Sequence, residues 1–273
     1  MTNRAELWRE QVERVRAAGP EALAQMLDLE RIEQNLFRAN YVFDEPHSLF
    51  GGQVLAQALV AAGRTVEGAR PVHSLHAYFL RAGDPKQPLV LEVFRDRDGR
   101  SFSARRVVAV QNGEVILNLS CSFTVAQEGL DAQPGAAPDV PGPGRVEHMP
   151  RLFSFEVAQT REEAPHTRIP ERIWGRCVAD LGDDTLLHAA ALTYFSDISA
   201  GIVRFETDVD RLGPSLDHAM WFHAPARADD WLLLDLAPDR VLNGRGLYSG
   251  GLYTPDGVLV ASVSQEQLFR RQR

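Results

Sequence analysis

The chain has 273 residues, of which 44% are hydrophobic and 24% are charged, and its formal net charge is −8. This composition is typical of a soluble globular protein, and the length allows one large domain or two small ones. The acidic balance argues against nucleic acid as a partner, because phosphate contacts need clustered Lys and Arg. We expect no membrane insertion and no signal peptide, because long apolar runs are missing and the N-terminus is charged throughout.

Two cysteines, Cys121 and Cys177, lie far apart in segments that we interpret as core. A disulfide framework or a four-cysteine zinc site is therefore not expected. We expect a cytoplasmic protein without a metal or another cofactor.

The first half of the chain predicts helices followed by strands. Two short helices are expected over 5–17 and 21–28, and a third over 50–66, where apolar side chains recur at i, i+4 and i+8. The apolar period then changes to two, which predicts a meander of about four strands, at 72–80, 88–97, 101–111 and 114–125. Asn112-Gly113 between the last two strands is typical of a hairpin turn.

Residues 126–150 hold five of the 16 prolines and show no periodicity, which predicts a linker near the middle of the chain. The second half then repeats the order of the first. It predicts a helix over 183–197, capped by Asp183 or Asp184, and strands at 153–160, 167–180, 215–225, 231–238, 244–254 and 257–269. The pattern favours two copies of one α+β unit, in which an antiparallel sheet wraps one apolar helix.

The sequence resembles the acyl-CoA thioesterase II family from about Leu29 onward. The resemblance rests on five motifs, which are FGGQVLAQAL at 50–59, VHSLHAYFLRAGD at 72–84, DGRSFSARRVVAVQNG at 98–113, LDHAMWFH at 216–223 and YTPDGVLVASVSQE at 253–266. It implies a tandem, or double, hotdog fold of the α+β class, with an antiparallel sheet around a long central helix in each unit. The implied divisions are a helical extension at 1–28, a first hotdog at 29–125, the linker at 126–150 and a second hotdog at 151–273.

The resemblance implies hydrolysis of fatty acyl-CoA to a free acid and coenzyme A, by a homodimer or homotetramer. The catalytic residues of the family match Asp197, Ser215 and Gln265, all in the second half. A common form of the family has Thr where this chain has Ser215. Thioester hydrolysis needs a positioned water, a group that takes its proton and donors for the developing oxyanion. We interpret Asp197 as the base, with Ser215 and Gln265 holding the water.

Neighbouring positions carry further expectations. Asp217 is expected on the strand face of Ser215, where it would assist Asp197 or compete with it, and His218 is expected to point the other way. Backbone N–H groups at the start of a helix are expected to contribute to the oxyanion site, although the sequence does not say which helix. Gly51, Gly52 and Gln53 open the helix at 50–66, where the glycines either permit close packing or shape a substrate site.

Histidines and arginines leave alternatives open. His73 and His76 should face opposite sides of a strand, which disfavours a shared metal ion, and His73 is a candidate for the acyl channel. The basic positions Arg100, Arg105 and Arg106 indicate a solvated sheet face by default, and contact with coenzyme A phosphates as the alternative.

Two alternative functions compete with hydrolysis. Asp183 and His188 have the Asp-x4-His spacing of acyl-CoA hydratases and dehydratases of the hotdog type. A non-catalytic acyl-CoA-binding protein is the other alternative, and the presence of all three polar site positions argues against it.

Overall fold

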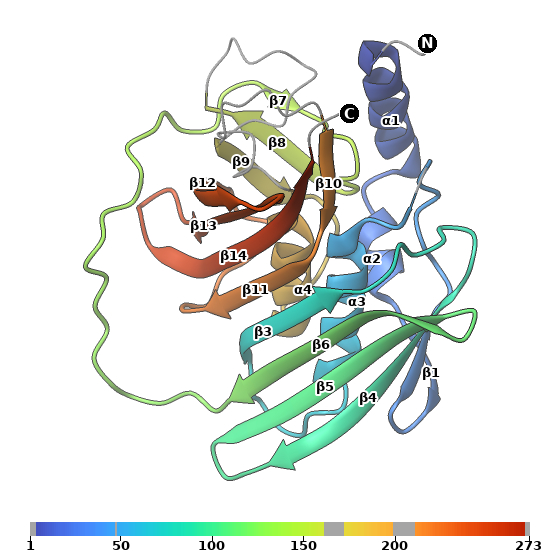
Figure 1. The fold of residues 1–273 in the computed structure, drawn as a ribbon. Helices are drawn as coiled ribbons and strands as arrows, with labels where there is room; N and C mark the ends of the chain where they lie inside the picture. The colour runs from blue at the N-terminus through green and yellow to red at the C-terminus, as the bar shows by residue number, and fades with distance from the viewer. Residues whose placement is uncertain (1–3, 47, 161–171, 199–210, 271–273) are drawn as a thin grey trace.

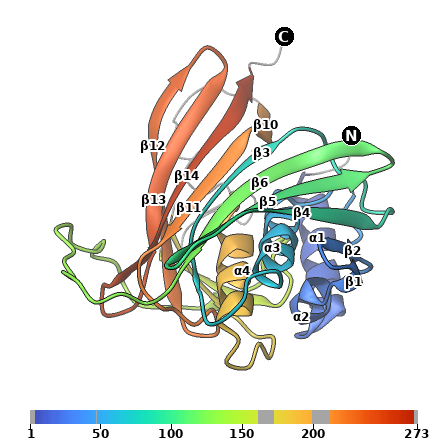
Figure 2. The ribbon, with the colours of Figure 1, turned by 90° about the horizontal axis from the view of Figure 1, so that it is seen from below.

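The computed structural model describes residues 4–46, 48–160, 172–198 and 211–270. Within these ranges, 14 strands form one continuous sheet, in which every paired strand is antiparallel to its neighbour. The sheet is strongly curved, and the helices lie on its concave side (Figures 1 and 2). The predicted α+β class, an antiparallel sheet with few helices, is confirmed.

The first half contains the three helices and the four strands that hydrophobic periodicity predicts, together with a hairpin that it does not predict. Helices α1 and α2 precede a short hairpin of β1 and β2, and helix α3 is followed by four strands. The bounds are α1 (Arg4–Ala18), α2 (Ala22–Leu27), β1 (Glu30–Glu33), β2 (Leu36–Ala39), α3 (Gly51–Gly63), β3 (Val72–Phe79), β4 (Leu89–Asp98), β5 (Phe102–Gln111) and β6 (Glu114–Thr124).

The second half follows a largely irregular connection, as the proline content of residues 126–150 predicts. Asp184 caps helix α4, because its side chain accepts the N–H groups of Leu186 and Leu187. The bounds are β7 (Val146–Glu147), β8 (Phe155–Gln159), β9 (Arg172–Cys177), α4 (Thr185–Ser196), β10 (Arg211–Ser215), β11 (Asp217–Phe222), β12 (Leu232–Leu242), β13 (Arg245–Tyr253) and β14 (Leu259–Arg270). The strand predicted at 167–180 falls partly on 167–171, outside the described residues.

The same order of strands occurs twice in the sheet. The first half gives β2-β4-β5-β6-β3, and the second gives β9-β12-β13-β14-β11. The two runs meet where β3 pairs with β11, from Ser74 opposite Trp221 to Tyr78 opposite Asp217. The predicted four-strand meander is wrong in one respect, because β3 crosses to the far side of β6 instead of pairing with β4. This crossing places β3 beside the second half.

Helices α3 and α4 pack against each other inside the curve of the sheet (Figure 2). Helix α3 also contacts five strands of the first half and is buried from Gly52 to Ala62. Helix α4 lies against β9, where a Cβ on Gly175 would lie 2.4 Å from the ring of Phe195. The start of α3 lies at the end of α4, beside the seam between the two halves, because a Cβ on Gly51 would meet both Asp197 and the ring of Phe79 in β3.

Local features agree with the sequence signals. Asn112 and Gly113 both have positive φ, at 50° and 78°, as a tight hairpin requires. Cys121 and Cys177 are buried free thiols. No helix within the described ranges is long and apolar enough to cross a membrane.

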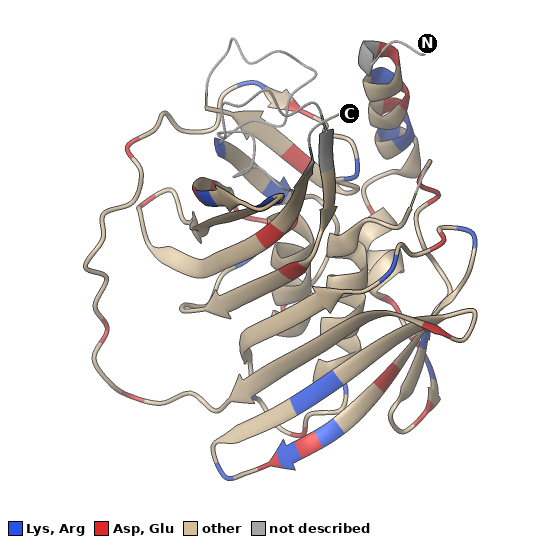
Figure 3. Ribbon diagram, in the orientation of Figure 1, with Lys and Arg blue, Asp and Glu red and all other residues tan. Residues whose placement is uncertain are grey.

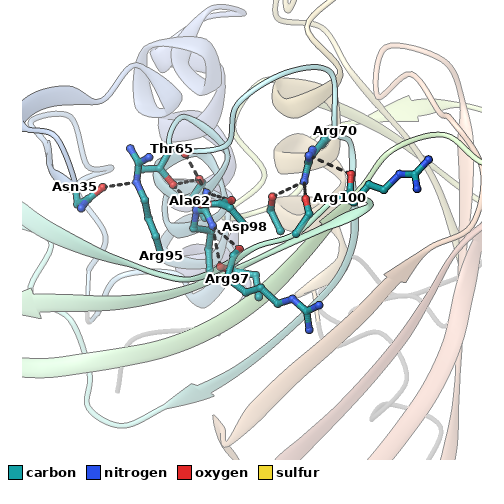
Figure 4. Close-up of polar contacts among 12 residues, drawn as sticks. Asn35, Ala62, Thr65, Arg70, Arg95, Arg97, Asp98 and Arg100 are labelled. Atoms are coloured by element: carbon teal, nitrogen blue, oxygen red, sulfur yellow. Dashed lines mark hydrogen bonds and ion pairs between the residues drawn. The ribbon is translucent and has the colours of Figure 1, made fainter.

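Arg105 corrects the expectation of a solvated basic face. Its side chain is 1% exposed and donates to Oγ1 and the carbonyl of Thr65, to the Arg97 carbonyl and to Oδ1 of Asp98 at 2.7 Å. Contacts around Thr65, Arg97 and Asp98 appear in Figure 4. The guanidinium ties β5 to the end of α3. Arg106 lies on the outer side, with its Cζ 4.1 Å from the Phe94 ring centroid, among the mixed charges that Figure 3 shows on β4 and β5.

Candidate active site

Asp197 lies where α4 ends and α3 begins. It is the first residue after α4, and its side chain is 4% exposed. The N–H of Gly52, in the first turn of α3, donates to its carboxylate. The first turn of a helix presents free N–H groups and a partial positive charge, so it is a favourable place for an anion.

The two glycines at the start of α3 permit this approach. A Cβ on Gly51 would lie 2.7 Å from Oδ2 of Asp197 and 2.8 Å from the ring of Phe79. A Cβ on Gly52 would lie 2.6 Å from the carbonyl oxygen of Tyr194. Contacts this short cannot form without movement, so the glycines give close packing and shape the surroundings of Asp197 at once. The close packing expected of the pair is therefore observed, and its part in a substrate site stays a prediction.

Burial raises the pKa of Asp197 to about 7. The hydrogen bonds from Gln265 and Gly52, together with the charge of Arg151, act in the opposite direction because they favour the carboxylate. A carboxyl group that titrates near pH 7 is suited to take a proton from water.

Gln265 connects the predicted residues. Its side chain is fully buried in β14, and its Nε2 donates to Oδ1 of Asp197 at 2.7 Å and to Oγ of Ser215 in a short hydrogen bond. Both hydrogens of the amide are thereby used. The structure thus brings Asp197, Ser215 and Gln265 together from α4, β10 and β14.

His218 is a member of this cluster that sequence reasoning missed. The expectation that it points away from the site is wrong: its Nδ1 lies 2.6 Å from Oε1 of Gln265, and its Nε2 lies 2.9 Å from Oγ of Ser196. The ring is fully buried, and burial lowers its pKa to about 4, against the hydrogen bond with Gln265. The imidazole is therefore neutral at pH 7.

A β-bulge explains why strand alternation fails here. Ser215 pairs with Gln267, whereas Ala219 pairs with Ser264, so four steps on one strand match three on the other. The extra residue puts Ser215 and His218 on the same side, although they are three positions apart. The predicted strand at 215–225 is accordingly divided into β10 and β11 at Leu216.

Two other candidates, Asp217 and Gln53, have different surroundings. Oδ1 of Asp217 accepts the N–H of Glu266 at 2.8 Å, so this carboxylate is held by the backbone of β14, and it is not joined to the Gln265 amide. Gln53 is fully buried and accepts the N–H of Phe43 at 3.3 Å, on the side of the segment before α3.

His73 is separated from the cluster along β3. Its ring centroid lies 5.6 Å from that of Phe102, whereas the end of β3 near Asp197 is Phe79. Six residues of strand span about 20 Å, so the structure does not bring His73 to Asp197. His76 instead packs against Trp221 on the neighbouring strand, with ring centroids 5.0 Å apart.

The Asp-x4-His pair is engaged in separate contacts. Asp183 forms an exposed ion pair with Arg227 at 2.8 Å. His188 contacts the Gly182 carbonyl through Nε2 and accepts the Ala228 N–H through Nδ1. These contacts do not favour a hydratase site. In the described part of the chain, no group of three His, Cys, Asp or Glu side chains is placed to hold a metal ion.

The structure places a buried carboxylate, a hydroxyl and an amide together beside the start of a helix, on a curved antiparallel sheet. Proteins with this fold can be compared with the chain directly. A solved structure from Alicyclobacillus acidocaldarius described as having a hot dog fold has the same fold, with a TM-score of 0.77 at 20% identity over 93% of this chain and 99% of that one.

Two family models match the chain, the acyl-CoA thioesterase N-terminal domain at residues 43–124 and the C-terminal domain at 128–269. The chain belongs to the acyl-CoA thioesterase family. Acyl-coenzyme A thioesterase 8 from Homo sapiens is 34% identical, over 90% of this chain and 88% of its own length. Acyl-CoA thioesterase 2 from Haemophilus influenzae is 31% identical, over 91% of this chain and 96% of its own length.

An acyl-CoA thioesterase II of known structure, from Mycobacterium marinum, is 41% identical to this chain. The superposition covers 92% of this chain and 98% of that structure's chain, with a TM-score of 0.78.

Proposed function

We propose that this chain, which is an acyl-CoA thioesterase and hydrolyses acyl-CoA to a carboxylic acid and coenzyme A, does so with a water molecule held by Asp197, Ser215 and Gln265. The observation that carries the proposal is the double hydrogen bond of the Gln265 Nε2, to Asp197 and to Ser215. Because Ser215 Oγ accepts the hydrogen bond from this amide, its own hydroxyl hydrogen is left for a water or the thioester. Membership of the family supplies the substrate class.

In the proposed first step, the Asp197 carboxylate takes a proton from the water as the oxygen attacks the thioester carbon. A tetrahedral oxyanion forms, and Asp197 becomes neutral. Its environment suits this change, because burial already favours the protonated form. No covalent bond to the enzyme is required.

In the second step, the oxyanion collapses and the C–S bond breaks. The proton held by Asp197 passes to the sulfur, so coenzyme A leaves as a thiol and the carboxylate is restored. We place the oxyanion near the first turn of α3, where the helix start provides N–H groups. This helix start favours negative charge, because the Gly52 N–H already donates to the Asp197 carboxylate there.

We further propose that residues 29–125 and 151–273 are two hotdog units joined by the linker 126–150, with 1–28 as an extension. The repeated strand order supports this division. The site would then use Asp197, Ser215 and Gln265 of the second unit and the helix start of the first. We propose a cytoplasmic location, which the two free buried thiols support, and a homodimer or homotetramer.

A thiol-release assay over acyl-CoAs of graded chain length tests the proposal. We expect release of coenzyme A by the wild-type chain, and a loss of about 10³-fold in kcat for Asp197→Asn. Binding of acyl-CoA without thiol release would overturn the proposal in favour of a binding protein. Undiminished activity of Asp197→Asn would overturn the assignment of the base.

A further inference from the structure

We propose that His218 is a positioning residue, which holds the Gln265 amide with its nitrogen toward Asp197 and Ser215. The inference rests on the proposed function, because that amide orientation is what the water site requires. His218 touches neither Asp197 nor Ser215 within hydrogen-bond distance. Its Nδ1 lies 4.0 Å from Oδ1 of Asp197 and 2.6 Å from Oε1 of Gln265.

A side-chain amide can turn over and exchange its oxygen and nitrogen, so something must fix it. An ionised Asp197 favours the nitrogen on its side, because a carboxylate accepts hydrogen bonds and cannot donate them. The opposite end of the amide then presents Oε1 to His218, and the ring must donate from Nδ1. A neutral imidazole carries one N–H, so His218 must be in the Nδ1–H form.

Ser196 stabilises that form of the ring when its hydroxyl donates to Nε2. Its Oγ lies 2.9 Å from Nε2 of His218 and 2.9 Å from the carbonyl oxygen of Thr193. A hydroxyl has one hydrogen, which it donates to one of these acceptors at a time. When it donates to Nε2, the ring proton stays on Nδ1 and the Gln265 amide is held.

When the Ser196 hydroxyl donates to Thr193 instead, His218 must donate from Nε2 and accept at Nδ1. Gln265 then has to turn its nitrogen toward His218, and its oxygen faces Asp197. Two acceptors meet unless Asp197 carries a proton. The protonation of Asp197, the amide of Gln265 and the tautomer of His218 therefore form one coupled chain, with all of its side chains at most 4% exposed.

Three variants separate positioning from packing. His218→Asn keeps a donor near the place of Nδ1, and His218→Leu has a similar size without a donor. We expect His218→Leu to lower kcat by about 10- to 100-fold with KM within about 2-fold, and His218→Asn to recover most of the loss. Ser196→Ala should lower kcat by a smaller factor in the wild type and have no further effect in the His218→Asn background, where no Nε2 remains to be fixed.

The tautomer itself provides a readout that does not depend on activity. Long-range ¹H–¹⁵N spectra of the histidine-labelled protein distinguish a protonated ring nitrogen from a bare one. Above the pKa of Asp197 we expect the His218 signal to show Nδ1–H, and in Ser196→Ala we expect a mixture of the two forms.

The outcomes are distinct. An Nε2–H ring at high pH, or equal loss of kcat in His218→Leu and His218→Asn at unchanged thermal stability, overturns the positioning role. If the wild-type chain releases no thiol but the ring is Nδ1–H, the coupled chain stands and the proposed function fails. If His218→Leu does not fold, the spectra of the wild type and Ser196→Ala decide the question.

Discussion

The amide nitrogen of Gln265 lies 2.7 Å from Oδ1 of Asp197, although 68 positions separate the two residues in the chain. This contact joins β14, inside the sheet, to the end of α4, and the Gly52 N–H joins the same carboxylate to α3. A buried carboxylate is thereby held by donors from both halves of the molecule. Burial raises its pKa, and the hydrogen bonds from Gln265 and Gly52 fix its position.

The pH dependence of activity follows from Asp197. The base works as a carboxylate, so kcat/KM should rise with pH and level off above about pH 7. Gln265→Glu places a second carboxyl group against Asp197 and removes a donor, so the rising limb should move to higher pH and the plateau should fall. Gln267→Glu is the matched control, because Gln267 lies on the same strand as Gln265 but donates to the Gly213 carbonyl on β10. Rate profiles that coincide for all three proteins would contradict this assignment.

The free energy of unfolding should also depend on pH, because of the raised pKa of Asp197. The pKa of Asp197 in the folded protein, about 7, exceeds its ordinary value of 3.8. Its contribution to stability is therefore complete below pH 3.8 and is lost as pH rises through 7. Asp197→Asn removes this loss, so its free energy of unfolding relative to wild type should rise by about 3 kcal/mol between pH 5 and pH 8. Urea unfolding at both pH values measures it, and a constant difference would disprove the raised pKa.

Ser215 provides a test of the hydroxyl. Ser215→Ala removes the hydrogen available to the water, and we expect kcat to fall by about 10- to 100-fold. Ser215→Thr keeps the hydroxyl on a half-buried side chain and should retain kcat within a few-fold. Thiol release under saturating acyl-CoA compares the two variants. Equal losses in both would show that packing at this position matters and that the hydroxyl does not.

The start of α3 is sensitive to a single methyl group. Gly51→Ala sets a Cβ 2.7 Å from Oδ2 of Asp197, so the carboxylate must move. We expect kcat to fall by about 10²-fold, because a displacement of about 1 Å at a reacting group costs that much. Gly129→Ala is the control, since its Cβ would meet nothing within 4 Å. Circular dichroism checks that both variants fold, and a Gly51→Ala enzyme as active as the control would refute the close approach.

Arg105 should matter for stability and not for catalysis. Arg105→Met leaves the oxygens of Thr65 and Asp98 without their donor, and we expect a loss of about 2–4 kcal/mol in unfolding free energy. Arg106→Met, on the outer side of the same strand, should change stability by less than about 1 kcal/mol. Denaturant titrations compare them. A comparable loss in both variants would mean that the burial of Arg105 contributes little.

The sequence predicted most elements within a few residues, because helices and strands impose local periods on apolar side chains. The turn at Asn112-Gly113 and the cap at Asp184 were likewise readable, since each depends on its immediate neighbours. The pairing of β3 with β6 and β11 was not readable, because strand order depends on contacts between distant segments.

The sequence by itself determined the family resemblance, the repeated order of elements and the three residue types that form the site. Tertiary structure alone decided that His218 joins them, because a one-residue bulge at Leu216 reverses the alternation and cannot be read from the strand's own pattern. It also decided which helix start faces Asp197, and it buried Arg105 against the end of α3. Each of these features depends on which segments, distant in the sequence, pack against each other and bury their surfaces. The local period of apolar residues does not specify that packing.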